Sequence, residues 1–367
     1  MKAPRFTKLV AGLPSTVPFV GPETQERARG QKFAARLGAN ENVFGPSPKA
    51  IAAMQATIPD IWMYGDPENH DLKLALAAFH GVPPENIVVG AGIDGLLGSL
   101  ARMLVIGRTP VVTSLGAYPT FNFHVAGYGG VLNTVPYVGD HEDPSSLLEK
   151  ARDVDASLLY FANPDNPMGT WHDASVMQDM IDNVPDGTLL CLDEAYLEFA
   201  PVGTAPKLDV SNPNVIRMRT FSKAYGMAGG RVGYAIGHVD LIDSFNKVRN
   251  HFGMNRASQA GALAALGDQE YLVQTLANVS ASKVRIGEIV KSYGFSPIPS
   301  ATNFITLDCG RGGDFARALV AALIDQNIFV RMPFVTPQDR CIRVSAGRPQ
   351  DIDLFEQALP LALETLK

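Results

Sequence analysis

One lysine of the sequence stands among residues that suit a phosphate-bearing ligand. Lys223 lies in TFSKAYGMAGGRVGY (220–234), where Ser222 supplies a hydroxyl and Arg231 a planar, permanent cation. The short side chains of GMAGG let the backbone pass close to a ligand. A lone lysine at a strand end is usually a solvated surface charge. An amine beside a phosphate site instead fits pyridoxal 5′-phosphate (PLP), which needs a lysine imine and an anchored phosphate.

An acid ends a second apolar run. Asp193 lies in LLCLDEAYLEF (189–199), and Tyr196 follows three residues later. Ligands of α/β sheets bind at the carboxyl ends of parallel strands, although an acid there could equally cap a helix. In a PLP site such a carboxylate keeps the pyridine nitrogen protonated. We expect Tyr196, together with Asn166 in FANPDNPMGT (161–170), to hydrogen-bond the phenolic oxygen of the ring.

A glycine-rich turn, GAGIDG (90–95), has the GxGxxG spacing of dinucleotide-binding folds. Such folds also place an acid at the end of the next strand, and the run PVVTSLG has none. A turn of this kind at a helix N-terminus still suits a single phosphate. We therefore expect Gly92, Ile93 and Asp94 to bind the PLP phosphate through their backbones, and Tyr118 to stack on the ring.

Short apolar runs alternate with helical patterns between about residue 70 and residue 250. This alternation predicts an α/β domain with a mostly parallel sheet that helices cover on both faces. The predicted strands are 86–90, 110–114, 157–163, 188–194 and 215–222, and the clearest helices are 69–81 and 93–105.

The pattern changes after about residue 255 and predicts a smaller α+β domain. A long helical stretch (258–294) is followed by strands at 304–308, 329–332 and 341–345, a helix around 313–326 and a last helix from Asp351. The first forty residues are proline-rich and irregular. We expect three parts: an N-terminal arm on the side of the small domain (1–45), a large PLP-binding domain (46–255) and a small domain (256–367).

Composition argues against several classes of partner. The 367 residues include 31 Lys and Arg against 37 Asp and Glu, a net charge of −6 with no basic run. Nucleic acid and anionic membrane surfaces are therefore not expected. The three cysteines and seven histidines are dispersed, so no metal site is predicted. No apolar run is long enough to cross a bilayer and no signal peptide is recognisable, which favours the cytoplasm.

Taken together, these motifs resemble fold-type I PLP enzymes, and most closely the histidinol-phosphate aminotransferases and their broad-specificity relatives. ANENVFGPSP (39–48) is similar to the family's Asn-Glu-Asn-Pro-Tyr-Gly-Pro-Ser-Pro, and MYGDPENHDLKLALA (63–77) to its Tyr-Pro-Asp segment. The remaining motifs follow in family order: NPDNPMGT, LDEAY, RTFSKAYGMAGGRVGY and CIRVSAG.

The resemblance implies a homodimer with active sites at the subunit interface and small-molecule substrates. It implies that Lys223 carries the imine and that Asp193 faces the ring nitrogen. It places Tyr64 at the phosphate of the neighbouring subunit. The other implied roles are Asn166 and Tyr196 at the ring oxygen, Gly92, Ile93, Ser222 and Arg231 at the phosphate, Tyr118 on the ring, and Arg343, Arg331 and Asn42 at the substrate.

The sequence leaves the substrate open. Val43 and Phe44 replace the family's usual Pro and Tyr, and Asp165 and Met168 replace Asn and Thr. An apolar ring near the active-site entrance favours aromatic amino acids beside histidinol phosphate as donors, with a 2-oxo acid such as 2-oxoglutarate as acceptor. A PLP decarboxylase or lyase, such as those acting on phosphothreonine, would use the same cofactor residues. A non-enzymatic PLP-binding regulator would need a DNA-binding domain that the sequence does not suggest.

Overall fold

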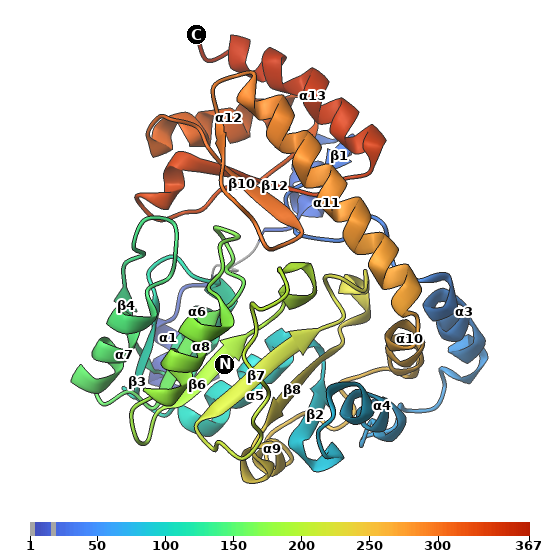
Figure 1. Cartoon of the computed structure of the whole chain (residues 1–367), viewed down its shortest axis with the longest axis vertical. Coiled ribbons are helices and arrows are strands. Elements are labelled where there is room, and N and C mark those ends of the chain that lie inside the picture. Colours follow the sequence, from blue (N-terminus) through green and yellow to red (C-terminus); the bar gives the residue numbers. More distant parts are fainter. Residues whose placement is uncertain (1–3, 16–19) are drawn as a thin grey trace.

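The computed structural model describes residues 4–15 and 20–367, and these form a large and a small unit (Figure 1). Residues 1–3 and 16–19 of the predicted arm lie outside the described part. The arm is not irregular throughout: α1 (Lys8–Gly12), α2 (Pro22–Arg29) and the short strand β1 (Ala35–Arg36) lie within it. Pro22 stands at the first position of α2, where its missing N–H costs nothing.

A seven-stranded sheet is the centre of the large unit. Its strand order is β2-β8-β7-β6-β5-β3-β4, and all strands run parallel except β8, which is antiparallel to both of its neighbours. The predicted α/β fold with a mostly parallel sheet is thus confirmed. The strands are β2 (Ile87–Gly90), β3 (Pro110–Ser114), β4 (Val131–Val135), β5 (Leu158–Ala162), β6 (Leu189–Asp193), β7 (Val215–Thr220) and β8 (Gly233–Gly237).

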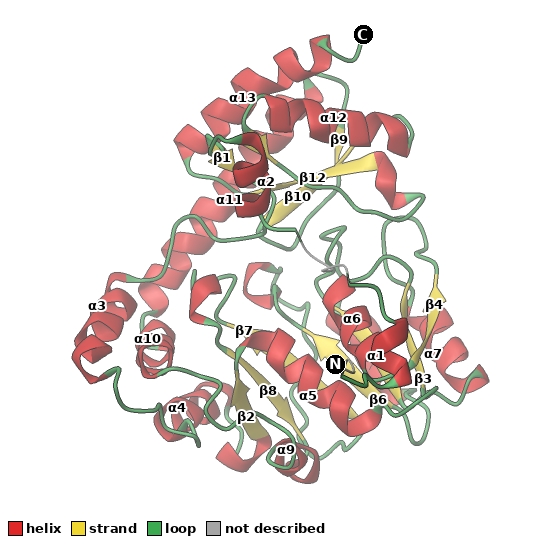
Figure 2. Ribbon diagram, turned by 180° about the vertical axis from the view of Figure 1, so that it is seen from behind, coloured by secondary structure: helices red, strands yellow, loops and turns green. Residues whose placement is uncertain are grey.

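The central strands read as continuous apolar runs because both faces of the sheet are covered. In β5, Tyr160 packs in the core beneath α5, whereas Phe161 packs in the core beneath α7 and α8. Figure 2 shows α5 and α6 in front of the sheet. The covering helices are α5 (Gly92–Leu104), α6 (Pro119–Gly127) and α9 (Val239–Phe245) on one face, and α7 (Pro144–Asp153) and α8 (Ala174–Asp182) on the other.

Strands β4 and β8 were not predicted from the sequence. Strand β4 lies at the sheet edge and is mostly exposed or half-buried, so it lacks the apolar run of a buried strand. Strand β8 has a glycine at each end, which leaves an apolar run of only three residues.

The small unit is built on two small sheets and three long helices. In one sheet β10 pairs with β12 and β9 antiparallel, and in the other β1 pairs parallel with β11. The strands are β9 (Ser296–Pro297), β10 (Phe304–Asp308), β11 (Ile328–Phe329) and β12 (Cys341–Ser345); the helices are α11 (Gln269–Lys291), α12 (Gly313–Asp325) and α13 (Pro349–Glu364). The predicted strand 329–332 is therefore shorter and begins one residue earlier.

The predicted helical stretch 258–294 is two helices, α10 (Arg256–Leu266) and α11, which part at Gly267 and Asp268. Helix α10 packs with α3 (Pro48–Thr57) and α4 (His70–His80) in a core of the large unit, and so does Leu272 near the start of α11. Ile286, farther along α11, belongs to the core of the small unit. The two cores therefore divide within α11 rather than at residue 255.

Five short 3₁₀ helices complete the secondary structure of the described residues: Ile58–Asp60, Pro84–Asn86, Leu197–Phe199, Ala228–Gly230 and Gln338–Arg340. No helix in the described part of the chain is long and apolar enough to cross a membrane.

The turn after Lys223 packs directly on the segment 39–48 through two glycines, Gly226 and Gly45. Gly226 has φ +68°, and a Cβ on it would lie 2.3 Å from the carbonyl carbon and oxygen of Gly45. Neither backbone can shift easily, because Asn42 of the segment donates a hydrogen bond to the backbone oxygen of Lys223 in the turn.

We predict that Gly226→Ala lowers the free energy of unfolding by more than about 2 kcal/mol, since it adds a backbone clash to the cost of a left-handed alanine. Gly81→Ala is the matched control, because Gly81 has φ +66° with nothing within 4 Å of a Cβ. The control should lose only about 1 kcal/mol. Equal losses in chemical denaturation of the two variants would contradict the proposed contact.

Candidate active site

A cleft with an empty volume of about 1090 Å³ opens at the carboxyl ends of β5, β6 and β7. Its walls include residues of the small unit, so it lies between the two units. Parallel strands bring their carboxyl ends to one edge of the sheet, which is where such folds bind ligands. Eleven residues that were predicted from the sequence line the cleft. They come from both units: Ile93, Asp94, Tyr118, Asn166, Asp193, Tyr196, Ser222, Lys223, Arg231, Arg331 and Arg343.

Asp193 is the last residue of β6 and its carboxyl group is buried. The Tyr160 hydroxyl donates to Oδ2 at 2.7 Å, and the Ala195 backbone N–H donates to Oδ1 at 3.0 Å. Burial raises the pKa of Asp193 to about 6, although both hydrogen bonds and the nearby Lys223 lower it. A carboxyl group oriented in this way can hold a proton on a basic ring atom placed in the cleft.

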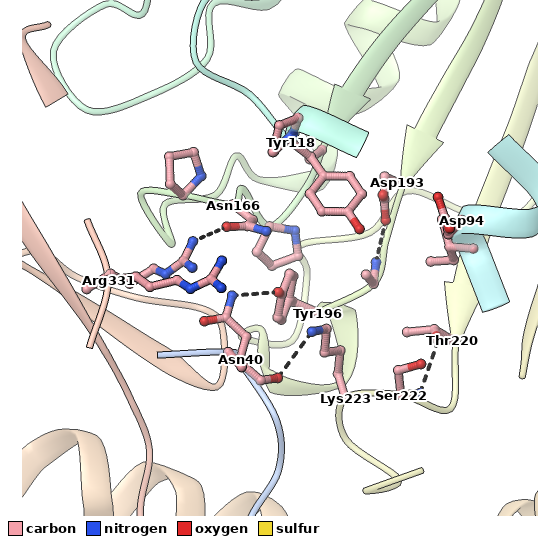
Figure 3. A pocket seen from close by; sticks show the side chains of 18 of the residues that line it. Asn40, Asp94, Tyr118, Asn166, Asp193, Tyr196, Thr220, Ser222, Lys223 and Arg331 are labelled. Atoms are coloured by element: carbon pink, nitrogen blue, oxygen red, sulfur yellow. Dashed lines mark hydrogen bonds between the residues drawn. The ribbon is translucent and has the colours of Figure 1, made fainter. Parts of the chain in front are cut away.

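Lys223 follows β7 and reaches the floor of the cleft (Figure 3). Its Nζ donates to the backbone oxygen of Asn40 at 3.1 Å and lies 5.4 Å from the centre of the Tyr196 ring. Burial, together with the positive charge of Arg343, lowers the pKa of Lys223 to about 8. A substantial share of neutral amine near pH 8 makes this side chain a competent nucleophile and base.

A corner of the cleft is suited to an anion of phosphate size. Helix α5 begins there at Gly92, whose φ is +74°, and a Cβ on Gly92 would lie 2.5 Å from Nη2 of Arg231. Nη1 of Arg231 donates to Oγ of Ser222 at 3.4 Å. Only glycine leaves room for the guanidinium at this helix N-terminus. Backbone N–H groups, a hydroxyl and a cation thus converge on one point.

Two arginines approach the cleft from the small unit. The backbones of Arg331 and Arg343 pair with each other through N–O distances of 3.2 and 2.6 Å. Nη1 of Arg343 donates to Oδ1 of Asn166 at 2.5 Å, while its buried Nε has no hydrogen-bond partner within residues 4–15 and 20–367. Burial lowers the pKa of Arg331 to about 10, and its Nη2 donates to the backbone oxygen of Val20. Buried guanidinium groups of this kind suit an anionic ligand.

Two tyrosines lie on the walls of the cleft. The Tyr196 hydroxyl accepts a hydrogen bond from Nδ2 of Asn40 at 3.0 Å, which leaves its own proton to donate. Burial raises the pKa of Tyr196, and it raises the pKa of Tyr118 to about 12, so both stay neutral. Tyr118 points into the cleft on the side of Asp193 (Figure 3).

Four residues singled out from the sequence do not line the cleft: Gly92, which packs against the Arg231 guanidinium, and Tyr64, Asn42 and Phe44. Tyr64 is 76% exposed and its ring packs on Phe252 at 4.7 Å between centroids. Asn42 donates to the backbone oxygens of Lys223 and Ala224 at 3.1 Å. Its side chain therefore fixes the backbone that carries the lysine and does not line the cleft. Phe44 does not line the cleft either, so its ring is not part of the cleft wall.

Sequence reasoning missed three residues of the site. Asn40 was quoted only within the segment 39–48, and nothing in that segment separates it from Asn42. Tyr160 stands in the apolar run SLLYFAN, where only the strand register shows that it reaches Asp193. Phe334 lines the cleft and is 75% exposed, on a segment with no recognisable motif.

Comparison with known proteins gives consistent matches. The sequence model "Aminotransferase class I and II" matches residues 34–359. Histidinol-phosphate aminotransferase of Anaeromyxobacter sp. is 34% identical over 326 residues, which is 88% of this chain and 89% of the relative. Histidinol-phosphate aminotransferase 1 of Nitrosococcus oceani is 33% identical over 361 residues, 98% of this chain and 96% of the relative.

A solved structure matches the whole chain. The crystal structure of histidinol-phosphate aminotransferase from Sinorhizobium meliloti, in complex with pyridoxal 5′-phosphate, is 50% identical with a TM-score of 0.97. The match covers 100% of this chain and 99% of that one.

The buried lysine gives a prediction about the ligand-free protein. Lys223→Met removes the ammonium group and should raise the free energy of unfolding near pH 7. The upper limit is about 3.5 kcal/mol, since one pKa unit is about 1.4 kcal/mol and the pKa falls from 10.5 to about 8. The folded pKa is the lower one, so the cost of the buried charge is full below about pH 8 and disappears above about 10.5.

The measurement is chemical denaturation of wild type and variant between pH 7 and pH 10.5. The difference between the two proteins should shrink as the pH rises. A difference in unfolding free energy that is independent of pH would show that the folded protein does not disfavour the charged form of Lys223.

Proposed function

The chain belongs to the class I and II aminotransferase family, and on this premise we propose that it is a PLP-dependent enzyme that moves an amino group from histidinol phosphate or an aromatic amino acid to a 2-oxo acid such as 2-oxoglutarate. Membership confirms the family resemblance predicted from the motifs. The observation that carries the proposal is one cleft in which a buried amine, a buried carboxyl and an anion corner face each other. PLP has a partner in that cleft for each of its functional groups.

The residues present fit the cofactor. Gly92 lacks the Cβ that would displace Arg231, and the buried Nε of Arg343 has no acceptor among the residues that the structure describes. When bound, PLP supplies an electron-accepting ring that stabilises negative charge on the substrate carbon. Gly92, Ile93, Ser222 and Arg231 would hold the phosphate.

Three side chains would orient the ring. Asp193, fixed by Tyr160 and Ala195, would keep a proton on the ring nitrogen. A partly buried pair of this kind at about 4 Å is worth roughly 4 kcal/mol at an effective dielectric constant of about 20. The free hydroxyl proton of Tyr196 and the amide N–H groups of Asn166 would donate to the ring oxygen.

Lys223 would carry the cofactor and then move the proton. Its pKa of about 8 allows the freed amine to accept a proton from the donor carbon and to return it nearby. Asn42 holds the backbone of Lys223 from below, and Tyr118 would cover the ring face and exclude water.

Substrate recognition would depend on the small unit. A guanidinium binds a carboxylate through two parallel hydrogen bonds and can also bind a phosphate, so Arg343 and Arg331 fit both kinds of donor. The relatives named histidinol-phosphate aminotransferase support histidinol phosphate. Because Phe44 lies outside the cleft, the aromatic part of the proposal now depends on Phe334.

A homodimer is also part of the proposal. The exposed Tyr64 lies next to other exposed apolar side chains, and a second copy of the chain would cover them: Ile58, Ile61, Trp62 and Phe252. Tyr64 cannot serve the cleft of its own chain, since it does not line it. We propose that it reaches the phosphate of the neighbouring subunit.

A donor panel tests the reaction. With 2-oxoglutarate, wild type should form glutamate from histidinol phosphate and from phenylalanine or tyrosine. Arg343→Ala should lower kcat/KM for each donor more than about tenfold, since it removes one partner of a desolvated charge pair. Arg311→Ala, at an exposed arginine of the small unit, is the control and should change nothing.

Each result has its own meaning. Release of carbon dioxide without glutamate would replace the aminotransferase with a decarboxylase. Turnover of histidinol phosphate alone would remove the aromatic donors. An unchanged Arg343→Ala enzyme would remove the anion-binding role.

Complementation tests the dimer. Tyr64→Ala and Lys223→Ala chains, each inactive alone, should regain about a quarter of wild-type activity after subunit exchange, since half of the dimers are hybrids with one native site. Asp193→Ala mixed with Lys223→Ala is the control and should regain nothing, because both residues serve one site. Equal recovery in both mixtures, or none in exchanged dimers, would argue against Tyr64 acting across the interface.

A further inference from the structure

Two buried carboxyl groups lie behind the contact between Asn166 and Arg343. Asp165 immediately precedes Asn166, and Glu142 lies between β4 and α7. Each residue is only 2% exposed. The proposed mechanism uses neither of them, although Asp165 is one of the positions where the sequence departs from the family motif.

Each carboxyl group has its own donors. Oγ of Ser114 donates to Glu142 at 2.5 Å, and the Ala162 backbone N–H donates to it at 3.2 Å. The Tyr137 hydroxyl donates to Oδ1 of Asp165 at 3.0 Å. The Met168 N–H donates to Oδ2 of Asp165 at 2.9 Å.

The two carboxyl groups lie close enough that each changes the pKa of the other. An ionised carboxylate can only accept, so a hydrogen bond between two carboxyl groups needs one proton. Burial raises the pKa of Glu142 well above its usual range, and the neighbouring Asp165 raises it further. Burial raises the pKa of Asp165 only to about 6, because its donors and Arg343 oppose the rise. These opposing directions favour a neutral Glu142 beside a charged Asp165 near neutral pH.

This pair supports the turn that meets Arg343. Oδ1 of Asn166 accepts from Arg343 at 2.5 Å, and the Pro167 carbonyl accepts from Oγ1 of Thr306, in β10 of the small unit, at 2.9 Å. The turn thus joins the large unit to the small one. A single negative charge, that of Asp165, faces the buried guanidinium of Arg343.

We propose that Glu142 is a positioning residue for donor recognition: as a neutral acid it donates a hydrogen bond to Asp165 and so fixes the turn that holds Asn166 against Arg343. The inference rests on the proposed role of Arg343 in binding the anionic end of the donor. Without this hydrogen bond the Asp165 carboxylate loses a donor and the turn loses its support. The Arg343 side chain is then misplaced for binding the donor, while the side chains around Lys223 keep their positions.

Two substitutions of Glu142 test whether this position needs a hydrogen-bond donor, a negative charge or only a side chain of this volume. Glu142→Gln keeps an N–H donor for Asp165 and an acceptor for Ser114, so KM and kcat should stay within about threefold of wild type. Glu142→Leu fills the space without a hydrogen bond. Its KM for histidinol phosphate should rise more than about tenfold, while kcat and the visible absorbance of bound PLP change little.

Glu198→Leu is the matched control. Burial also raises the pKa of Glu198, to about 7, but this residue lies near Arg219 and does not line the cleft. The control should leave the donor KM unchanged, so a general effect of losing a buried acid is separated from the positioning effect.

An infrared difference spectrum supplies a second readout that does not depend on turnover. Wild-type holoenzyme at neutral pH should show the C=O stretch of a protonated carboxylic acid that Glu142→Gln lacks. Absence of this difference would overturn the neutral acid even if Glu142→Leu failed to fold. Equal losses in the Gln and Leu variants would also overturn it, because a carboxylate would then be required.

An unchanged KM in Glu142→Leu would overturn the positioning role. Failure of the proposed function has a different signature: wild type itself would not turn over the donors, or Arg343→Ala would keep its kcat/KM. The infrared band reports on the acid pair in either case.

Discussion

The structure depends on one residue at which the two units meet the reactive amine. Asn40 accepts from Nζ of Lys223 and donates to the Tyr196 hydroxyl, both within the large unit. On the other side its backbone N–H donates to Oγ of Ser345, and its carbonyl accepts from Nδ2 of Asn303. It does so in a left-handed conformation, φ 54°, which asparagine tolerates better than most residues. A movement of the small unit relative to the large one would therefore displace a direct hydrogen-bond partner of Lys223.

Burial is the common cause of the unusual charges in the cleft. It brings the pKa of Lys223 down to about 8 and that of Asp193 up to about 6, which moves both groups toward neutrality. A protein that gathers a half-buried amine, a buried carboxyl and two guanidinium groups, one of them buried, in one cleft carries a large desolvation cost. A ligand with a phosphate, a basic ring nitrogen and a carbonyl group would compensate much of it, which is why the fit to PLP is chemical as well as geometric.

The acid pair extends the same reasoning away from the cofactor. Asp165 and Glu142 do not touch the cleft floor, yet they lie under the turn that Arg343 contacts. In the proposed pair, one shared proton leaves one negative charge facing Arg343 instead of two. The large unit would then contribute to donor recognition through a turn, while the guanidinium groups come from the small unit.

The sequence by itself determined the fold class and eleven of the residues that line the cleft. Buried parallel strands read as apolar runs, and Asn166, Asp193 and Lys223 follow such runs, so the convergence of strand ends predicts their meeting. It could not place Tyr160 on Asp193, because strand register decides which face a side chain takes. Nor could it place Phe44 outside the cleft, divide the cores within α11, or pair Glu142 with Asp165. These features depend on contacts between segments far apart in the chain, which only the tertiary structure decides.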